Sequence, residues 1–292
     1  MQPAVLWRAT RAYSLPASVV PVVLGTVLAA RGDGTASGEG QFDPGTFALA
    51  LVGAVLAHFG ANVLNDYFDF IKGVDTRPEH GSGVLTGGFM TAAQALNFAV
   101  LLLGGAGLCG LLLLRVHRDV VFPLGLLGLG CAVLYPAFLK KYGFGDLLIV
   151  LAFGLGLTLG AYGVQARSNS VRSWLLIALY SLPVCLLVDA ILHANNLRDA
   201  PDDRAANVRT LATLLPKRAG EAWQLFLLFA PLLFVGIGVL TRLLPLWSLV
   251  TFLSLPLLIR AARTGDVPAT AQTHLGFGLL YTSSFLLRPV FL

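Results

Sequence analysis

The sequence is poor in charged residues and above all in acids. Only 12% of its 292 residues are charged, 15 residues are Asp or Glu, and 56% are hydrophobic. Water-soluble domains carry about twice this share of charged residues. Disordered chains combine low hydrophobicity with high net charge, and this sequence has neither property. The composition therefore excludes both classes and predicts a multi-pass membrane protein.

Several familiar site signatures are also missing from the sequence. The three cysteines, Cys109, Cys131 and Cys185, lie inside apolar stretches and lack the spacing of metal ligands. No P-loop, dinucleotide-binding fingerprint or Ser-His-Asp order occurs. The net charge of +5 comes without a basic run or basic residues interleaved with aromatics, so we expect no nucleic-acid partner.

Nine apolar runs separated by polar connections make up most of the chain. They lie near residues 14–31, 46–66, 95–114, 119–138, 144–166, 173–195, 221–240, 243–261 and 270–291. The first run follows two arginines, so a signal peptide is an alternative, but an uncleaved first helix suffices because eight more runs follow. We expect one all-α domain over 1–292, with nine transmembrane helices around a central cavity. The long polar stretches 67–94 and 196–220 should cap that cavity as loops.

The distribution of positive charge predicts the orientation in the membrane. With a cytoplasmic N-terminus, the cytoplasmic side carries 13 of the 20 Lys and Arg residues and the other side 7. Without the five in 196–220, which could bind a ligand, the difference falls to 8 against 7. We therefore expect a multi-pass protein of the cell (inner) membrane whose N-terminus and motif loops are cytoplasmic.

Two acidic clusters stand at corresponding positions of this plan, at the ends of the second and sixth runs. They share the pattern Asn-x-x-x-Asp-x-x-Asp, as Asn62, Asp66 and Asp69 in the first and Asn195, Asp199 and Asp202 in the second. On a helix, residues three and four apart share a face, so Asn65 joins the first stripe and Asp203 the second. The pattern predicts an internal pseudo-repeat, with motif one at 62–88 and motif two at 195–211.

The clusters favour a metal–phosphate site. Several close carboxylates repel one another unless protons or a cation are present. Oxygen ligands without cysteine suit Mg²⁺, which binds through one or two carboxylates together with substrate phosphates. Two acid clusters could therefore hold a diphosphate between two ions. The cations Lys72, Arg198, Arg204 and Arg209 could bind the same phosphate oxygens. The alternative for either cluster alone is a solvated helix end.

Both motifs resemble those of the UbiA superfamily of intramembrane prenyltransferases. The stretch Asn65-Asp66-Tyr-Phe-Asp69-Phe-Ile-Lys72-Gly-Val-Asp75 resembles its first aspartate motif. The stretch Asn195-Asn196-Leu-Arg198-Asp199-x-x-x-Asp203, followed by Arg209-Thr-Leu, resembles its second. Within the superfamily the sequence is most similar to the dihydroxynaphthoate polyprenyltransferases of the menaquinone pathway. Tyr135-Pro, Lys140-Lys141-Tyr-Gly-Phe-Gly-Asp146 and Gly-Ala-Tyr162-Gly-Val-Gln also favour that branch.

The resemblance implies Mg²⁺-dependent transfer of a polyprenyl group from its diphosphate to an aromatic acceptor in the bilayer, namely 1,4-dihydroxy-2-naphthoate with loss of CO₂. One Mg²⁺ would be held by Asp66, Asp69 and Asp75 and the other by Asp199 and Asp203, with help from Asn62, Asn65, Asn195 and Asn196. Lys72, Arg198 and Arg209 would offset the charge of the departing pyrophosphate. Aromatic side chains that could stabilise an allylic cation are Phe68, Tyr135, Phe153 and Tyr162, although aromatics at helical spacing usually serve core packing.

The sequence departs from the family pattern at a few positions. Val208 replaces a lysine expected before Arg209, and 80–88 lacks an expected arginine. Asp189 and His193 are polar residues within the sixth run that could orient or deprotonate the acceptor, or serve only helix packing. Lys140 and Lys141 could reach the substrates or only anchor the membrane surface.

Two alternatives remain at this point. One is a superfamily member with another aromatic or lipid acceptor. The other, a cation-coupled transporter, would place its acids near the bilayer midplane at unwound helices, and only Asp189 fits that picture.

Overall fold

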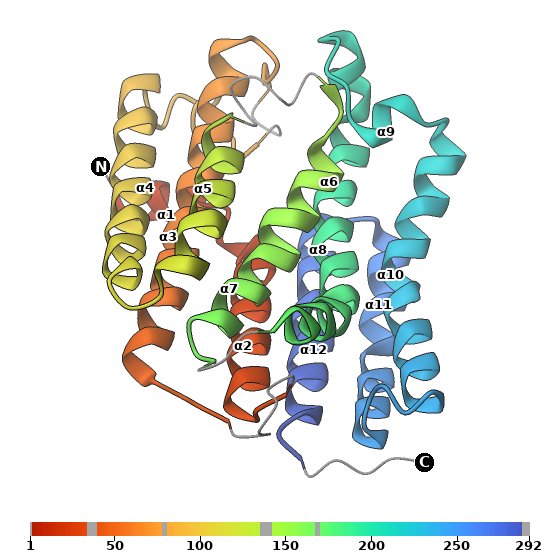
Figure 1. Cartoon of the computed structure of the whole chain (residues 1–292). Coiled ribbons are helices and arrows are strands. Elements are labelled where there is room, and N and C mark those ends of the chain that lie inside the picture. Colours follow the sequence, from red (N-terminus) through yellow and green to blue (C-terminus); the bar gives the residue numbers. More distant parts are fainter. Residues whose placement is uncertain (1, 34–39, 78–80, 135–141, 167–169, 288–292) are drawn as a thin grey trace.

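The computed structural model describes residues 2–33, 40–77, 81–134, 142–166 and 170–287, and all regular elements in these ranges are helical. Figure 1 shows long helices gathered into one bundle. In chain order the elements are α1 (Pro3–Ala9), η1 (Ala12–Ser14), α2 (Pro16–Ala30), α3 (Pro44–Ile71), α4 (Ala92–Leu114), α5 (Arg118–Leu134), α6 (Gly145–Ile149) and η4 (Val150–Gly156). They continue with α7 (Leu157–Gly163), α8 (Val171–Ala205), α9 (Leu211–Leu214), α10 (Lys217–Leu240), η5 (Leu246–Ser254), α11 (Leu255–Thr264) and α12 (Val267–Ser284).

Local sequence signals fix where several helices begin. The Asp43 side chain accepts a hydrogen bond from the Thr46 backbone N–H, and Pro44 follows at the first helical position of α3. Thr91 and Gln94 form a reciprocal capping box at α4, and Ser170 and Ser173 form another at α8. Such caps satisfy backbone N–H groups that have no partner within the helix.

The predicted all-helical membrane fold is confirmed, and each of the nine apolar runs contains helix within the described ranges. Seven helical stretches there are long and apolar enough to cross a membrane. They begin at residues 12, 44, 92, 145, 171, 217 and 246. The count of nine spans stays a prediction: α5 is described over only 17 residues, and α12 is interrupted by polar side chains such as Gln272 and His274.

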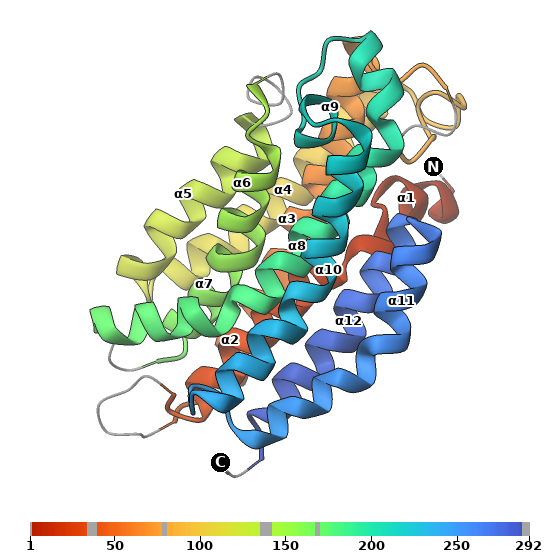
Figure 2. The ribbon, with the colours of Figure 1, turned by 90° about the vertical axis from the view of Figure 1, so that its right-hand side faces the viewer.

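The bundle has a buried centre and two more exposed flanks. In Figures 1 and 2, α4 and α5 form one flank and α10 and α11 lie on the other, with α3 and α8 between them. In the most apolar stretch of 18 residues in each helix, 56% of the residues are buried in α8 but only 17% in α4. Leucines exposed on α4, such as Leu101 and Leu108, therefore present an apolar surface suited to lipid. The polar residues Thr270, Thr273 and His274 of α12 are instead buried among other helices.

The second polar stretch is helical rather than a loop, which corrects the sequence prediction. The expected boundary was residue 195, but α8 continues to Ala205 and carries all the acids of the second motif. Pro201 lies inside the helix, although a proline removes one backbone hydrogen bond and often ends a helix. Only 206–210 and the turn 215–216 separate α8, the short α9 and α10. The motif is therefore held on a rigid element.

Two glycines allow helices to approach closely at the bundle centre. A Cβ on Gly25 of α2 would stand 2.1 Å from the Thr158 carbonyl oxygen of α7. A Cβ on Gly154, in the π-helical segment η4, would stand 2.6 Å from the Cys185 sulfur of α8. Small residues permit such approaches in membrane bundles, where close van der Waals packing drives association.

We expect Gly25→Ala to destabilise the protein by about 1–3 kcal/mol, because its methyl group would overlap a backbone oxygen that cannot rotate away. Thermal unfolding of the detergent-solubilised protein should show Tm lowered by about 2 °C or more. Gly107→Ala in α4 is the control, because nothing lies within 4 Å of its Cβ position. Equal Tm values for the two variants would contradict the close α2–α7 contact.

Candidate active site

The first acid motif occupies the last turns of α3, and the chain then reverses sharply. Gly73 adopts a left-handed conformation with φ of 69°, and the Val74 N–H donates to the Asp69 carbonyl oxygen at 2.9 Å. This is the hydrogen-bond pattern of a Schellman helix end, in which a left-handed residue reverses the chain. The reversal returns Asp75 to the end of the helix, where its N–H donates to the same carbonyl oxygen.

The second acid motif ends its helix in the same way. Asn207 is left-handed with φ of 56°, and the Val208 N–H donates to the Asp203 carbonyl oxygen at 2.8 Å. Asp203 thus corresponds to Asp69 in position relative to the helix end. The helix ends therefore align Asp69 with Asp203, whereas the sequence pattern aligned Asp69 with Asp202. The sequence alone could not decide between the two alignments, because both place an acid opposite Asp69.

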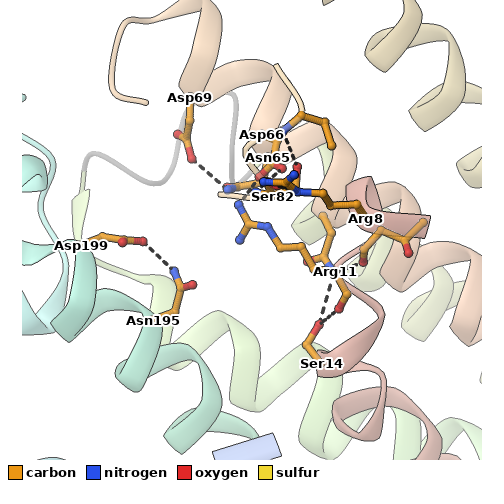
Figure 3. Close-up of polar contacts among 12 residues, drawn as sticks. Arg8, Arg11, Ser14, Asn65, Asp66, Asp69, Ser82, Asn195 and Asp199 are labelled. Atoms are coloured by element: carbon orange, nitrogen blue, oxygen red, sulfur yellow. Dashed lines mark hydrogen bonds and ion pairs between the residues drawn. The ribbon is translucent and has the colours of Figure 1, made fainter. Parts of the chain in front are cut away.

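The two acid motifs line one small pocket of about 20 Å³, the acid pocket. Figure 3 shows Asn65 and Asp69 facing Asn195 and Asp199 across it. The Asn65 amide donates to Asp69 at 2.9 Å, and the Asn195 amide donates to Asp199 at 3.1 Å. The lining residues are Arg11, Asn65, Asp69, Val74, Asp75, Gly81, Asn195, Asn196, Asp199, Asp202 and Asp203. Residues from two segments that are distant in the sequence therefore line one pocket.

Among the residues that the structure describes, Arg11 is the one cation that lines the acid pocket. Its guanidinium forms an ion pair with Asp66, which also accepts a hydrogen bond from the Ser82 N–H at 3.0 Å. Burial lowers the pKa of Arg11, but the carboxylate of Asp66 and, further away, those of Asp75 and Asp199 raise it, and the net shift is upward. Arg11 therefore stays charged. The sequence indicated only its role in membrane orientation, because nothing local links it to an acid 55 residues away.

The donor set of the acid pocket suits a hard cation shared with a substrate. Within the part of the chain that the structure describes, no three His, Cys, Asp or Glu side chains converge closely enough to hold a metal ion on their own. The pocket instead offers separate carboxylates and amide groups on opposite walls. Mg²⁺ commonly takes one or two carboxylates and completes its shell with water and phosphate oxygens. The residues fit an ion that arrives together with a diphosphate.

A larger cavity of about 170 Å³, the main cavity, adjoins the acid pocket. Arg11, Asn65, Asn195 and Asn196 line both spaces and form the boundary between them. The other residues of the main cavity are Tyr13, Ser14, Ala17, His58, Ala61, Asn62, Cys131, Ala132, Gly145, Leu148, Ile149, Phe153, Val188, Ile191, Leu192 and Val267. A polar compartment and a largely apolar one therefore meet at four side chains.

The predicted cationic residues lie around the acid pocket without lining it. Arg198 donates to Asp199 at 2.7 and 2.8 Å and to the Asn195 amide oxygen at 2.9 Å. The ammonium group of Lys72 lies 5.2 Å from the centre of the Phe68 ring. Arg204 donates to the backbone carbonyls of 212, 213 and 215. It therefore binds the segment of α9 to the end of α8 and does not line the pocket. Arg209 lines neither space.

Asp189 and His193 lie behind the cavity wall and do not pair with each other. His193 is fully buried, with its Nδ1 3.4 Å from Asp146 of α6 and its Nε2 3.0 Å from the Gly220 carbonyl oxygen. Asp189 hydrogen-bonds with Asp146 as well. Sequence spacing suggested an Asp189–His193 pair, but a neighbouring helix supplies the shared partner. Asp146 was present in the family-like stretch without an assigned role.

Three other predicted residues do not line the acid pocket. Tyr162 is fully buried, and its hydroxyl donates to the Asp33 carbonyl oxygen at 2.9 Å, at the opposite end of α2 from Arg11. Asn62 lines the main cavity rather than the acid pocket. Phe68 packs edge-on against Tyr67 near the end of α3. Tyr135, Lys140 and Lys141 lie outside the described residues.

A model of the UbiA prenyltransferase family matches residues 18–280 of the chain. The chain belongs to this family. The UbiA prenyltransferase domain-containing protein 1 homolog of Drosophila melanogaster is 35% identical to this chain. The match covers 94% of this chain and 77% of the length of the Drosophila protein. A UbiA homolog from Aeropyrum pernix K1 has a similar fold, with a TM-score of 0.66, 17% identity and coverage of 94% and 96%. A UbiA homolog from Archaeoglobus fulgidus bound to GPP and Mg²⁺ also has a similar fold, with a TM-score of 0.63 and 10% identity. The match covers 97% of this chain and 98% of that homolog.

Family membership makes this protein a prenyltransferase, as its two acid motifs predicted. The alternative of a cation-coupled transporter does not agree with that membership. The relatives do not single out the menaquinone branch, so the identity of the acceptor is a matter for proposal.

Gly81 provides a test of the acid pocket. A Cβ there would lie 2.7 Å from the Arg11 guanidinium, 2.8 Å from the Asp66 carboxylate and 2.9 Å from that of Asp75. We expect Gly81→Ala to lower kcat/KM about tenfold or more by displacing these groups. Gly88→Ala is the matched control, because its φ is also positive but nothing lies within 4 Å of its Cβ position. Equal losses in steady-state assays of both variants would attribute the effect to backbone strain alone.

Proposed function

We propose that this enzyme transfers a polyprenyl group from a prenyl diphosphate to an aromatic acceptor in an Mg²⁺-dependent reaction. The observation that carries the proposal is the direct junction of an acid pocket with a largely apolar cavity at Arg11, Asn65, Asn195 and Asn196. A prenyl diphosphate has the same two parts, a highly charged head and an apolar chain. The homolog bound to GPP and Mg²⁺ supports this pairing of ligand and ion.

Two sets of oxygen ligands would hold two Mg²⁺ ions. Asp66, Asp69 and Asp75 form the set on and after α3, and Asp199 and Asp203 form the set on α8. The amide groups of Asn65, Asn195 and Asn196 would assist, and Asn62 would do so only through a change from its present position in the main cavity. Bound Mg²⁺ would neutralise the charge that builds on the diphosphate oxygens as the bond to carbon breaks.

The cationic side chains would complete the charge balance at the departing diphosphate. Arg11 lines the acid pocket, and Lys72, Arg198 and Arg209 lie at or near the ends of the two acid-bearing helices. Arg11 would exchange part of its contact with Asp66 for contact with phosphate oxygens, because a guanidinium binds carboxylate and phosphate with the same geometry. Lys140 and Lys141 remain proposed contributors from the stretch that follows α5.

The main cavity would shield the allylic cation from water. Its wall includes Leu148, Ile149, Phe153, Val188 and Ile191, which offer apolar or aromatic contacts. The electrons of the breaking C–O bond go to the diphosphate, and a ring carbon of the acceptor supplies the pair for the new C–C bond. The acceptor we propose is 1,4-dihydroxy-2-naphthoate, which then loses its carboxylate as CO₂ and regains aromaticity. Other aromatic or lipid acceptors are the alternative.

We also propose a cytoplasmic site in a cell (inner) membrane. Arg8 donates to the Ser82 carbonyl oxygen and Arg11 pairs with Asp66, so the N-terminal segment and the first motif lie at one end of the bundle. The second motif shares that end, the upper one in Figure 1. The excess of Lys and Arg on the side of the N-terminus supports a cytoplasmic position.

The test uses detergent-solubilised enzyme, radiolabelled polyprenyl diphosphate, and either Mg²⁺ or EDTA. We expect labelled product with 1,4-dihydroxy-2-naphthoate and not with 4-hydroxybenzoate. EDTA should abolish it, and Asp66→Ala should reduce it about 100-fold or more, because the charge on the leaving group is then poorly offset. Glu221→Gln is the control, since Glu221 is exposed on α10 and pairs with the nearby Lys217.

Product formation in EDTA would contradict the metal requirement. Product with 4-hydroxybenzoate alone would move the acceptor to another aromatic class while leaving prenyl transfer intact.

A further inference from the structure

One wall of the main cavity carries a connected polar strip formed by Ser14, His58 and Asn62, which we call the polar strip. The Ser14 hydroxyl lies 2.8 Å from His58 Nε2, and the Asn62 amide nitrogen lies 3.4 Å from the same hydroxyl. All three side chains line the cavity. They come from η1 and α3, so both elements must be in place for the strip to exist.

The hydrogen bonds define the direction of each donor in the polar strip. The Ser14 hydroxyl has one hydrogen, which it donates to the Arg11 carbonyl oxygen at 2.8 Å. His58 Nε2 therefore carries the hydrogen of the imidazole and donates to Ser14. The other nitrogen, Nδ1, lies 2.7 Å from the Ser18 hydroxyl. Hydrogen-bond partners at both nitrogens hold the imidazole in one orientation.

Asn62 is left with an acceptor directed to no protein group. Its amide nitrogen donates to the Thr10 carbonyl oxygen at 2.9 Å. Within the described residues, no hydrogen bond reaches its amide oxygen. Because a polar group in an apolar cavity is costly when left without a partner, this oxygen offers a position where a ligand hydroxyl would be favoured.

The lining of the main cavity also includes apolar side chains, among them Leu148, Ile149, Phe153 and Val188. The Phe153 ring packs edge-on against His58, with 5.4 Å between the ring centres. A flat ring in this cavity can therefore contact apolar groups while a hydroxyl substituent meets the polar strip. The volume of about 170 Å³ exceeds that of an apolar protein cavity of about 150 Å³ that binds benzene.

We propose that the polar strip is the acceptor subsite, and that it selects aromatic rings bearing a hydroxyl group. A ring hydroxyl would donate to the Asn62 amide oxygen, and the His58–Ser14 pair would hold the Asn62 amide in the orientation that presents this oxygen to the cavity. This inference rests on the proposed function, since it assigns a place to the acceptor of that reaction. Asn62 lies one helical turn before Asp66, so a ring held there would be close to the boundary with the acid pocket.

The experiment compares two acceptors that differ by one hydroxyl, 1,4-dihydroxy-2-naphthoate and 1-hydroxy-2-naphthoate, in wild type, His58→Gln and Asn62→Leu. We expect wild type to prefer the dihydroxy compound in kcat/KM by about tenfold, the effect of one well-placed hydrogen bond. At least one variant should reduce this preference to about threefold or less, because the group that recognises the hydroxyl is gone or is no longer held in place. In His58→Gln, which leaves the proposed Mg²⁺ ligands intact, the KM for the prenyl diphosphate should change less than about twofold.

His274→Gln is the matched control, because His274 is also fully buried but lies in α12 and lines no part of the main cavity. It should keep the tenfold preference. Thermal unfolding of every variant identifies losses that come from folding alone.

The outcomes separate the two proposals. An undiminished preference in both variants, with activity present, would overturn the acceptor subsite and leave prenyl transfer standing. No transfer to either naphthoate by folded wild type would overturn the proposed acceptor and the subsite with it.

Discussion

The ion pair between Arg11 and Asp66 is the interaction on which the site depends. Asp66, Asp69 and Asp203 are all at least 94% buried, and an ionised carboxylate pays several kcal/mol for leaving water. Arg11 supplies positive charge from the segment before α2, and the N–H of Ser82 supplies a further donor. The need to compensate the buried charge of Asp66 therefore holds together the N-terminal segment, α3 and the loop after α3. Loss of either partner would leave a buried charge uncompensated, at about 3–5 kcal/mol.

Features with a local periodic signal could be predicted from the sequence. Hydropathy located all nine helical runs, and spacings of three and four residues placed Asn65 with Asp69 and Asn195 with Asp199. Arg11 could not be found in this way, because its partner is far along the chain. The helical extension 196–205 was also missed, because hydropathy detects apolar helices and these residues form a polar helix. Pro201 added a misleading local signal for a helix end.

The polar residues of α8 show a second limit of sequence reasoning. Asp189 and His193 share a helix face, which suggested a pair, yet both turn towards Asp146 on α6. Which neighbouring helix faces a given side chain is decided by packing, and packing leaves no periodic trace. The same holds for His58, whose two serine partners come from η1 and α2. Histidine spacing along α3 gives no indication of them.

Both acid motifs end their helices, and this has an electrostatic consequence beyond the carboxylates. The carbonyl end of a helix carries roughly half a negative charge, and α3 and α8 direct these ends to one pocket. The field there opposes a bare diphosphate and attracts cations. Under the proposed function, the prenyl diphosphate would therefore bind together with its Mg²⁺ counter-ions or after them. The two helix ends that build the pocket would disfavour phosphate compounds that arrive without a cation.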